Sequence, residues 1–330
     1  MAVRQARAAG RIEIRPYRLR LARPLRTAHG VHEVREGFLV LAHDGNLVGR
    51  GDAAPLPDLG TESLAECHEQ LRRARFDSLP ETPAARCAVE QALLDLDAQR
   101  AGIPLARLLE RAAPLEVPAS ALLSAQSVPE LARESQRARA EGFRILKLKV
   151  GLDGDYARAA VVRDAAGPAI SLRLDANGAW DSQSALRKLR ELAPLGIELC
   201  EQPTPDLLGL EGSPVPLAAD EMIAVDPEGA LERAQIIVLK PMLLGGLIPA
   251  LRFARRAHGH GRKIVVTSSL ESAVGRAGAA HLAAAVLALG PQPAAGIATG
   301  RLFADDGAPD PFAPVDGVVR IPASPGLGVP

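Results

Sequence analysis

Two lysines lie two residues apart in the apolar stretch "RILKLKVG", Arg144 to Gly151. The aliphatic residues around them predict a buried β-strand, in which side chains two positions apart face the same side. Lys147 and Lys149 would then emerge together. Because unpaired ammonium groups are costly to bury, this face either meets water or lines a polar cavity whose anionic partners come from elsewhere in the chain.

Charged residues close successive apolar runs; in chain order they are Lys149, Asp175, Glu201, Asp220 and Lys240. They are separated by 26, 26, 19 and 20 residues, and each interval suits one strand-to-strand repeat. The carboxyl ends of parallel barrel strands meet at one mouth, so we expect the five side chains to converge there. The three carboxylates are hard oxygen ligands that suit Mg²⁺, with Mn²⁺ as a substitute. The lysines would remain free to move protons.

Each of these residues also has an ordinary structural interpretation. A Lys-x-Lys pair often marks a solvated strand edge, and an Asp or Asn after a strand often caps the next helix. Five charged residues in register with five repeats favour function over surface decoration. Within "AADE", we predict Asp220 rather than Glu221 as the third metal ligand, because side chains alternate along a strand and the apolar run points the last position inward.

From Val117 onward, short apolar runs alternate with amphipathic helical segments. The runs are "VPASALL", "ILKLKV", "SLRLDA", "GIELCE", "VPLAAD", "QIIVLK", "KIVVTS" and "AGIATG". Eight strand candidates at this spacing predict an α/β fold and favour a TIM-like barrel, over residues 116–304, rather than an open sheet. The sequence contains no GxGxxG or GxxxxGK[ST] pattern, the usual signals of a phosphate-binding loop.

Residues 1–115 predict a smaller α+β domain. Alternating stretches, "RIEIRPYRLRL", "GFLVLAHDG" and "LVGRGDAAPLP", are typical of antiparallel strands, with Asp44-Gly45 as a hairpin turn. Helical patterns follow in "TESLAECHEQLRRAR" and "PAARCAVEQALLDLDAQRAG". Residues 305–330 could complete this domain.

The composition of the 330 residues favours a small-molecule protein. Lys plus Arg equal Asp plus Glu at 39 each, so no overall charge favours nucleic acid or an anionic membrane. Cys67, Cys87 and Cys200 have no CxxC spacing, which fits buried thiols in a reducing compartment. No stretch has the ~18 uninterrupted apolar residues of a membrane span, and the first residues lack an apolar signal region. We therefore expect a cytoplasmic protein.

A family resemblance rests on motifs that occur in order along the chain. The stretches "LKLKVG", "LRLDANGAW", "CEQP", "AADE", "VLKPMLLGG" and "TSSLESAVG" resemble the enolase superfamily, specifically its muconate-lactonizing subgroup with one lysine on each side of the site. The N-terminal "LRTAHGVHEVREGFLVLAHDG" and "GRGDAAPLP" resemble the capping domain of that family. The resemblance covers nearly the whole chain and implies a modified TIM barrel, (β/α)7β, under an α+β capping domain.

Within the subgroup, the short capping loop, "SSLES" and the "ATG" ending resemble the o-succinylbenzoate synthase family. This implies Mg²⁺-dependent dehydration of 2-succinyl-6-hydroxy-2,4-cyclohexadiene-1-carboxylate in menaquinone biosynthesis. An N-acylamino acid racemase or another cycloisomerase of the subgroup would use the same lysines and carboxylates. The absence of an Asp-x-Asp on the eighth strand speaks against a dipeptide epimerase. A Schiff-base aldolase would leave three carboxylates idle, and a binding barrel without catalysis would not need the full set.

The proposed chemistry assigns a role to each lysine. Removing a proton α to a carboxylate gives a high-energy enediolate, whose charge Mg²⁺ would stabilise; lysine bases beside Mg²⁺ are a known pattern of enolase-superfamily sites. Lys149 is predicted as the base. Lys147 and the metal would both favour its neutral form, and Lys147 would also bind the substrate carboxylate. Lys240 would stay charged during dehydration or exchange the second proton in a racemase.

Further substrate contacts are predicted at Asn177, Ser268, Ser269 and Gly245. The alternative for the serines in "SSLES" is capping of the helix after the seventh strand; in the substrate interpretation they would hydrogen-bond the succinyl carboxylate. Gly245 and Gly246 predict a tight turn or a close backbone approach.

Residues of the N-terminal region are also candidates. Arg26 to Gly30 and Arg35 are predicted either to touch substrate or, for Arg35, to lie on a solvated edge. His29 and His32 have no metal-ligand spacing and are predicted as loop residues.

Overall fold

The computed structural model describes residues 10–27, 30–304 and 310–329. The N-terminal sheet is antiparallel, in the order β1 (Arg11–Thr27), β2 (Gly30–Asp44) and β3 (Leu47–Ala53). Asp44 pairs with Leu47 across a two-residue turn in which Gly45 has φ of 60°, so the predicted hairpin is confirmed. Helices α1 (Leu64–Arg73) and α2 (Pro83–Ala101) follow.

Two glycines of β3 let α2 lie directly on the N-terminal sheet. A Cβ at Gly49 or Gly51 would come within 2.0 Å or 1.9 Å of a backbone carbonyl oxygen of α2. Glycine is therefore the residue that permits this approach. The apolar core between helix and sheet includes Val40, Leu71 and Val89.

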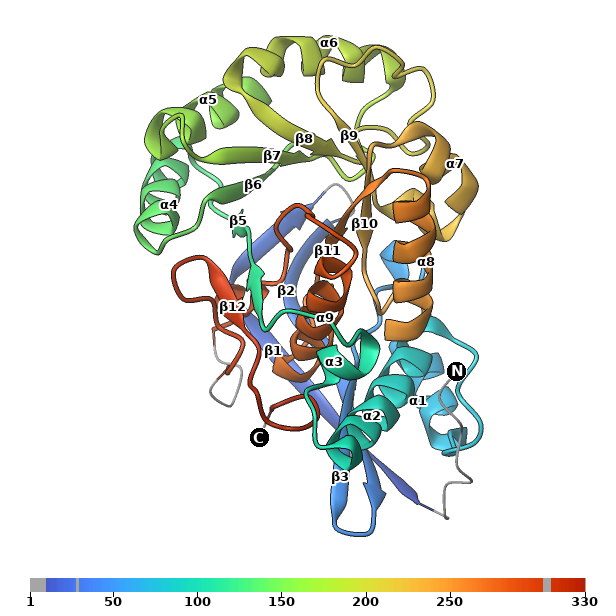
Figure 1. The fold of residues 1–330 in the computed structure, drawn as a ribbon. Helices are drawn as coiled ribbons and strands as arrows, with labels where there is room; N and C mark the ends of the chain where they lie inside the picture. Colours follow the sequence, from blue (N-terminus) through green and yellow to red (C-terminus); the bar gives the residue numbers. More distant parts are fainter. Residues whose placement is uncertain (1–9, 28–29, 305–309, 330) are drawn as a thin grey trace.

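A seven-stranded parallel sheet forms the second part of the molecule. Its strands, in spatial order, are β11 (Lys263–Val266), β10 (Ile236–Leu239), β9 (Leu217–Ala219), β8 (Ile197–Glu201), β7 (Ser171–Asp175), β6 (Ile145–Lys149) and β5 (Ala121–Leu123). The helices that follow these strands are α4 (Val128–Ala140), α5 (Asp155–Ala166), α6 (Ser182–Leu192), α7 (Pro227–Arg233), α8 (Leu247–Gly259) and α9 (Ala273–Leu287). The sheet is curled, with α4 to α8 along its outer side (Figure 1).

The two edges of the parallel sheet are connected through residues 295–296. Ala119, before β5, forms a parallel bridge with Ala295, and Thr267, after β11, forms one with Gly296. The predicted eighth run thus lies where the sequence analysis expects it, although it forms isolated bridges rather than a regular strand. Seven of the eight predicted runs contain strands.

Alternation along the strands separates two apolar layers. Leu146, Leu148 and Leu174 belong to the main core that includes buried residues of the surrounding helices. Leu199, Ala218 and Val238 belong to a separate buried cluster, and each lies two residues before a charged residue at its strand end. Because residues two apart face the same side, this inner cluster lies directly beneath the charged residues.

The C-terminal segment joins both parts of the molecule. Strand β12 (Val318–Arg320) pairs antiparallel with β4 (Glu116–Pro118). Further on, Gly326 O accepts a hydrogen bond from Leu105 N at 2.8 Å, in α3 (Leu105–Leu109), and Leu327 N donates to Asp95 Oδ1 at 2.7 Å.

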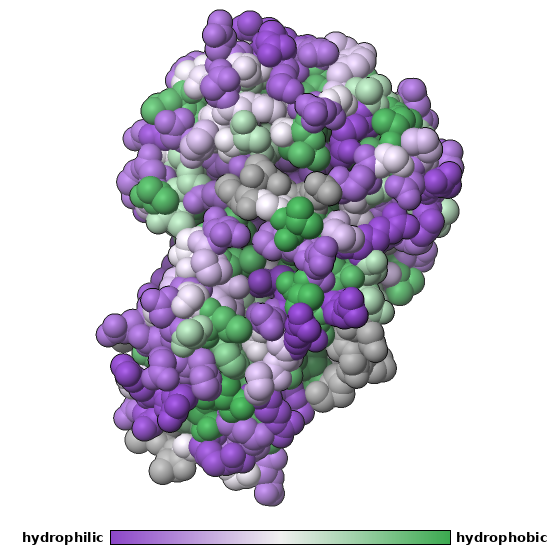
Figure 2. All heavy atoms as spheres, turned by 180° about the vertical axis from the view of Figure 1, so that it is seen from behind, coloured by the Kyte–Doolittle hydropathy of each residue, from purple (hydrophilic) through white to green (hydrophobic). Residues whose placement is uncertain are grey.

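The surface view from behind shows mainly polar residues, with apolar ones scattered among them (Figure 2). Among the described residues, no helix combines the length and apolar character that crossing a membrane requires.

Candidate active site

The predicted charged residues lie side by side at the carboxyl ends of their strands. Lys149 is the register partner of Asp175 on β7, which in turn is the register partner of Glu201 on β8. Asp220 and Lys240 directly follow β9 and β10. The three carboxylate residues are 1%, 3% and 5% exposed in chain order, so they form a buried acidic row across the curled sheet.

Each carboxylate of the row is bound by an ammonium group. Lys147 Nζ lies 2.7 Å from Asp175 Oδ2 and donates to Glu201 Oε1 at 2.8 Å. Lys149 Nζ donates to the same Asp175 oxygen at 2.7 Å. Lys240 donates to Asp220. The lysine pair of "RILKLKVG" therefore faces neither bulk water nor an apolar interior, because the carboxylates of the neighbouring strands supply its partners.

The three carboxyl groups of the row have pKa values shifted in different directions. Burial opposes ionisation of Asp175, but Lys147 and Lys149 outweigh it and hold the pKa of this carboxyl well below its usual range. Burial, together with the charge of Asp175, raises the pKa of Glu201 to about 8. Burial also raises the pKa of Asp220. Two of the three acids would thus gain from a further cation close to them.

Among the described residues, no three Asp, Glu, His or Cys side chains are arranged as ligands of one metal ion. Ammonium groups lie on the carboxylates instead, as the short bonds of Lys147 and Lys240 show. The donor chemistry nevertheless fits Mg²⁺, since three buried carboxylates from adjacent parallel strands offer hard oxygen ligands. We infer that Asp175, Glu201 and Asp220 would hold such an ion.

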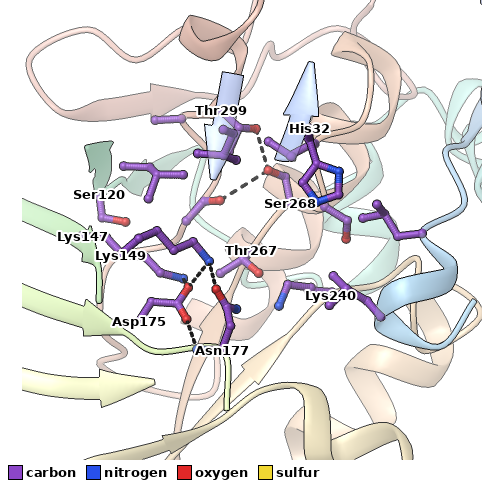
Figure 3. A pocket seen from close by; sticks show the side chains of 18 of the residues that line it. His32, Ser120, Lys147, Lys149, Asp175, Asn177, Lys240, Thr267, Ser268 and Thr299 are labelled. Carbon is purple, nitrogen blue, oxygen red and sulfur yellow. Dashed lines mark hydrogen bonds and ion pairs between the residues drawn. The ribbon is translucent and has the colours of Figure 1, made fainter. Parts of the chain in front are cut away.

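A pocket opens above this row. Its polar lining residues are His32, Asp58, Ser120, Lys147, Lys149, Asp175, Asn177, Lys240, Thr267, Ser268, Ser269 and Thr299. Its apolar lining residues include Leu25, Leu56, Leu59, Leu122, Leu270 and Ala298. Lys149 and Lys240 project toward the pocket from opposite sides (Figure 3). Two cations thus face one cavity across the space where a substrate would lie.

Asn177 forms hydrogen bonds with both Lys149 and Glu221. Its Oδ1 accepts from Lys149 Nζ at 2.5 Å, and its Nδ2 donates to Glu221 Oε1 at 2.7 Å. Asn177 has φ of 47°, a left-handed conformation that Asn tolerates better than most residues. Glu221 therefore orients Asn177, whereas Asp220 faces Lys240 as the sequence analysis expects.

The serines of "SSLES" divide between the two predicted roles. Ser272 caps α9 by accepting a hydrogen bond from Val274 N. Ser268 and Ser269 line the pocket instead. Ser268 Oγ bonds Thr299 Oγ1 at 2.6 Å, while the buried Ser269 Oγ has no hydrogen-bond partner within the described part of the chain.

Gly245, predicted as a substrate contact and, with Gly246, as a tight turn or close approach, lies in the turn after β10. It is absent from the residues that line the pocket, and a Cβ there would meet Arg86 of α2 at 3.2 Å. At Gly246 a Cβ would lie 2.0 Å from Glu90 Oε2. The glycine pair therefore serves the packing of α2 against the turn after β10.

Arg35 does not lie on a solvated edge, so that prediction was wrong: it is only 5% exposed and donates to the backbone carbonyls of Pro55 and Ala54. His32 belongs to β2 and lines the pocket, so the loop prediction was wrong. Ala28 and His29, in the predicted contact segment Arg26 to Gly30, lie outside the described residues.

Several lining residues escaped the sequence analysis. Thr299 lies near the end of the eighth predicted run, so the strand-end rule that identified the lysines could have found it. Ser120 lies in the first run but before β5, so that rule does not find it. Leu56, Asp58 and the other contributions of the N-terminal domain carry no comparable signal, since their position depends on how that domain docks.

Comparisons with known proteins agree with this arrangement. Residues 130–330 match the family model "Enolase C-terminal domain-like", and residues 12–98 match "O-succinylbenzoate synthase, N-terminal domain". The chain belongs to the enolase superfamily.

Individual relatives have several activities. The chain is 32% identical to L-Ala-D/L-Glu epimerase of Bacillus subtilis, over 83% of this chain and 84% of the relative. A solved structure of a B. subtilis L-Ala-D/L-Glu epimerase in complex with substrate superposes with a TM-score of 0.87, at 29% identity over 97% of this chain and 98% of that one. The o-succinylbenzoate synthase of Thermobifida fusca is 40% identical, over 62% of this chain and 66% of its own. The dipeptide epimerase of Methylococcus capsulatus, solved with Mg and L-Arg-D-Lys, has a TM-score of 0.85 at 29% identity, over 97% of this chain and 99% of that one.

Proposed function

We propose that this protein is an o-succinylbenzoate synthase, which catalyses Mg²⁺-dependent syn dehydration of 2-succinyl-6-hydroxy-2,4-cyclohexadiene-1-carboxylate through an enediolate, in menaquinone biosynthesis. We further propose that residues 116–304 form a modified TIM barrel, (β/α)7β, under a capping domain of residues 1–115. The observation that carries the proposal is the pair Lys149 and Lys240, which face one pocket from opposite sides above three buried carboxylates.

The site residues divide the reaction between them. Bound Mg²⁺ would supply positive charge to the substrate carboxylate as negative charge develops on it. Lys149 acts as the base that takes the α proton. The resulting ammonium lies on the same face and returns a proton to the departing hydroxyl, as a syn elimination requires. Lys240 remains charged on the opposite face and stabilises the intermediate.

The pocket lining suits this substrate. Leu25, Leu59 and Leu270 offer apolar contacts to a six-membered ring. Thr267 Oγ1 and Ser269 Oγ are buried hydroxyls without hydrogen-bond partners in the described part of the chain. Both line the pocket, so they are available to the terminal carboxylate of the succinyl chain.

Epimerisation is the second candidate. The B. subtilis and M. capsulatus relatives are epimerases that match most of this chain. Two lysines on opposite faces of one carbon are the arrangement that epimerisation or racemisation needs. Against a dipeptide, Ala298 and Thr299 end the eighth run without a carboxylate to bind an α-ammonium group. An N-acylamino acid racemase or another cycloisomerase of the subgroup has no such requirement.

The deciding experiment compares substrates on the wild type and on one variant, Lys240→Arg. Wild type is assayed for dehydration of the cyclohexadiene carboxylate and for racemisation of N-succinylamino acids and dipeptides. Lys240→Arg keeps a cation that cannot act as a base near neutral pH. We expect this variant to retain measurable dehydration and to lose any racemisation. Efficient wild-type racemisation or epimerisation with negligible dehydration would overturn the proposal.

A further inference from the structure

The turn between β11 and α9 forms one wall of the pocket. Ser268, Ser269 and Leu270 of this turn are lining residues. Leu270 has φ of 62°, a left-handed conformation that is unfavourable for a γ-branched residue and that persists only where surrounding contacts impose it. The contacts that hold Leu270 therefore decide where this wall lies.

Two of those contacts come from the N-terminal sheet. Asp52 Oδ2, at the end of β3, accepts hydrogen bonds from Ser272 N at 2.8 Å and from Ser272 Oγ at 2.6 Å. Arg35 Nε, on β2, donates to Leu270 O at 3.3 Å. The strained residue is thus fixed at its own carbonyl and again two residues later, by side chains that are more than 200 positions away in the sequence.

Asp52 is itself held firmly. It is fully buried, and its other oxygen accepts a hydrogen bond from Tyr17 OH at 2.8 Å. Tyr17, Asp52 and Ser272 form a continuous hydrogen-bonded chain from β1 to the N-cap residue of α9. A carboxylate in this position can accept from all three donors at once, which a neutral apolar side chain cannot do.

The turn also has an internal bond that depends on its shape. Ser269 N donates to Glu271 Oε2 at 2.6 Å, and Glu271 is only 1% exposed. This bond fixes the Ser269 backbone while leaving its buried Oγ without a partner in the described part of the chain. The position of a free hydroxyl donor in the pocket is therefore set through the turn.

We propose that Asp52 is a positioning residue, which holds the Leu270 turn so that Ser269 and Leu270 face the distal end of the substrate. Asp52 does not line the pocket and acts through Ser272. The identity of the distal group rests on the proposed function, but the effect on the turn does not.

Asp52→Ala is the principal test. We expect KM to rise about tenfold and kcat to stay within about threefold, the range for losing one or two buried hydrogen bonds that orient a binding group. Hydrogen–deuterium exchange of the peptide covering residues 267–275 should quicken in the same variant. Asp52→Asn keeps an acceptor oxygen for Ser272 and should restore both readouts to near wild type.

Glu90→Ala is the matched control. Glu90, on α2, is a buried carboxylate that accepts from Ile248 N at 3.1 Å, at the start of α8, so it crosses the same junction without touching the Leu270 turn. We expect its removal to quicken exchange around residue 248 and to leave KM unchanged. An equal rise of KM in both alanine variants would show general loosening and overturn the proposal.

Tyr17→Phe keeps the test decisive if Asp52→Ala fails to fold. It removes one hydrogen bond from Asp52, so a rise in KM of about two- to threefold is expected. Unchanged KM or unchanged exchange at residues 267–275 in the folded variants would contradict the inference. If the wild type acts on dipeptides instead of the cyclohexadiene, the proposed function fails. The positioning role of Asp52 is still tested by hydrogen–deuterium exchange of residues 267–275 and by KM for the dipeptide.

Discussion

At the scale of single residues, Lys149 occupies the position on which the proposed chemistry depends most. Its Nζ lies within hydrogen-bond distance of both Asp175 and Asn177, and its side chain lines the pocket. We expect Lys149→Ala to lower kcat by about 10²- to 10⁴-fold, the usual contribution of a general base. Exchange of the substrate α proton with solvent deuterium should vanish with it.

A lysine outside the pocket provides the comparison for this variant. Lys188, on α6, donates to Asp155 at 2.8 Å and lies over the Trp180 ring. Lys188→Ala also removes a paired ammonium, but it should leave turnover unchanged. Wild-type turnover in Lys149→Ala would mean that another group removes the proton.

The acidic row makes a prediction about metal. Burial and neighbouring charge raise the pKa of Glu201 to about 8, so a divalent cation beside it would favour its ionised form. We expect a chelator to abolish turnover and Mg²⁺ or Mn²⁺ to restore it. Glu201→Gln should require more metal for half-maximal activity, as a metal titration would measure. Full activity in excess chelator would contradict the ligand assignment.

At the scale of elements, the turn before α8 is held by a contact from α2. Gly246 has φ of 142°, and a Cβ there would lie 2.0 Å from Glu90 Oε2. Glu90 accepts from the backbone at the start of α8, so moving it aside would sacrifice this cap. We expect Gly246→Ala to lower the free energy of unfolding in urea by about 2–3 kcal/mol, from strain and the lost hydrogen bond together.

Gly261→Ala is a comparison at a positive-φ glycine that has no close neighbour. Gly261 has φ of 73°, but a Cβ there would meet no atom within 4 Å. This variant should lose only about 1 kcal/mol, the cost of a left-handed non-glycine residue. Equal losses in the two variants would show that the contact with Glu90 does not matter.

The strands and helices differ in how well the sequence predicts them. Strands of the parallel sheet were predictable because apolar runs end in charged residues at a regular interval. Helix α9, the helix expected after the seventh strand, has no amphipathic pattern of its own, because "AVGRAGAAHLAAAVL" is buried nearly all round and therefore lacks a polar face. The burial of Arg35 could not be predicted from the sequence, because the carbonyl oxygens that it binds, of Leu270 and Ala54, are distant in sequence.

At the scale of the whole molecule, His281 links separate segments. Its Nδ1 accepts from Ala106 N at 2.9 Å, and its Nε2 bonds Leu327 O at 3.0 Å. Burial lowers the pKa of His281 to about 4, so the folded protein holds it neutral. The unfolded chain binds this proton near pH 6.5, so the stability from His281 is complete above that pH and is lost as the pH falls toward 4.

The measurement is a difference between wild type and His281→Gln. Glu90 and Glu271, whose pKa values burial raises to about 7, act in the opposite direction over part of this range. Comparing the two proteins cancels that contribution. Between pH 7 and pH 4, we expect wild type to lose up to about 3 kcal/mol more unfolding free energy than the variant. Parallel curves would show that His281 is not neutral in the folded state.

The C-terminal segment has a consequence for the order in which the protein is made. Asp95 is 1% exposed, and one of its oxygens accepts from Leu327 N, 232 positions further along the chain. Strand β4 likewise pairs with β12, about 200 residues later. During synthesis, Asp95 and β4 emerge first and lack these partners until residues 318–327 have been translated. These contacts of the native fold therefore form only after about 200 further residues have been made, and until then the unpaired segments remain open to chaperones and proteases.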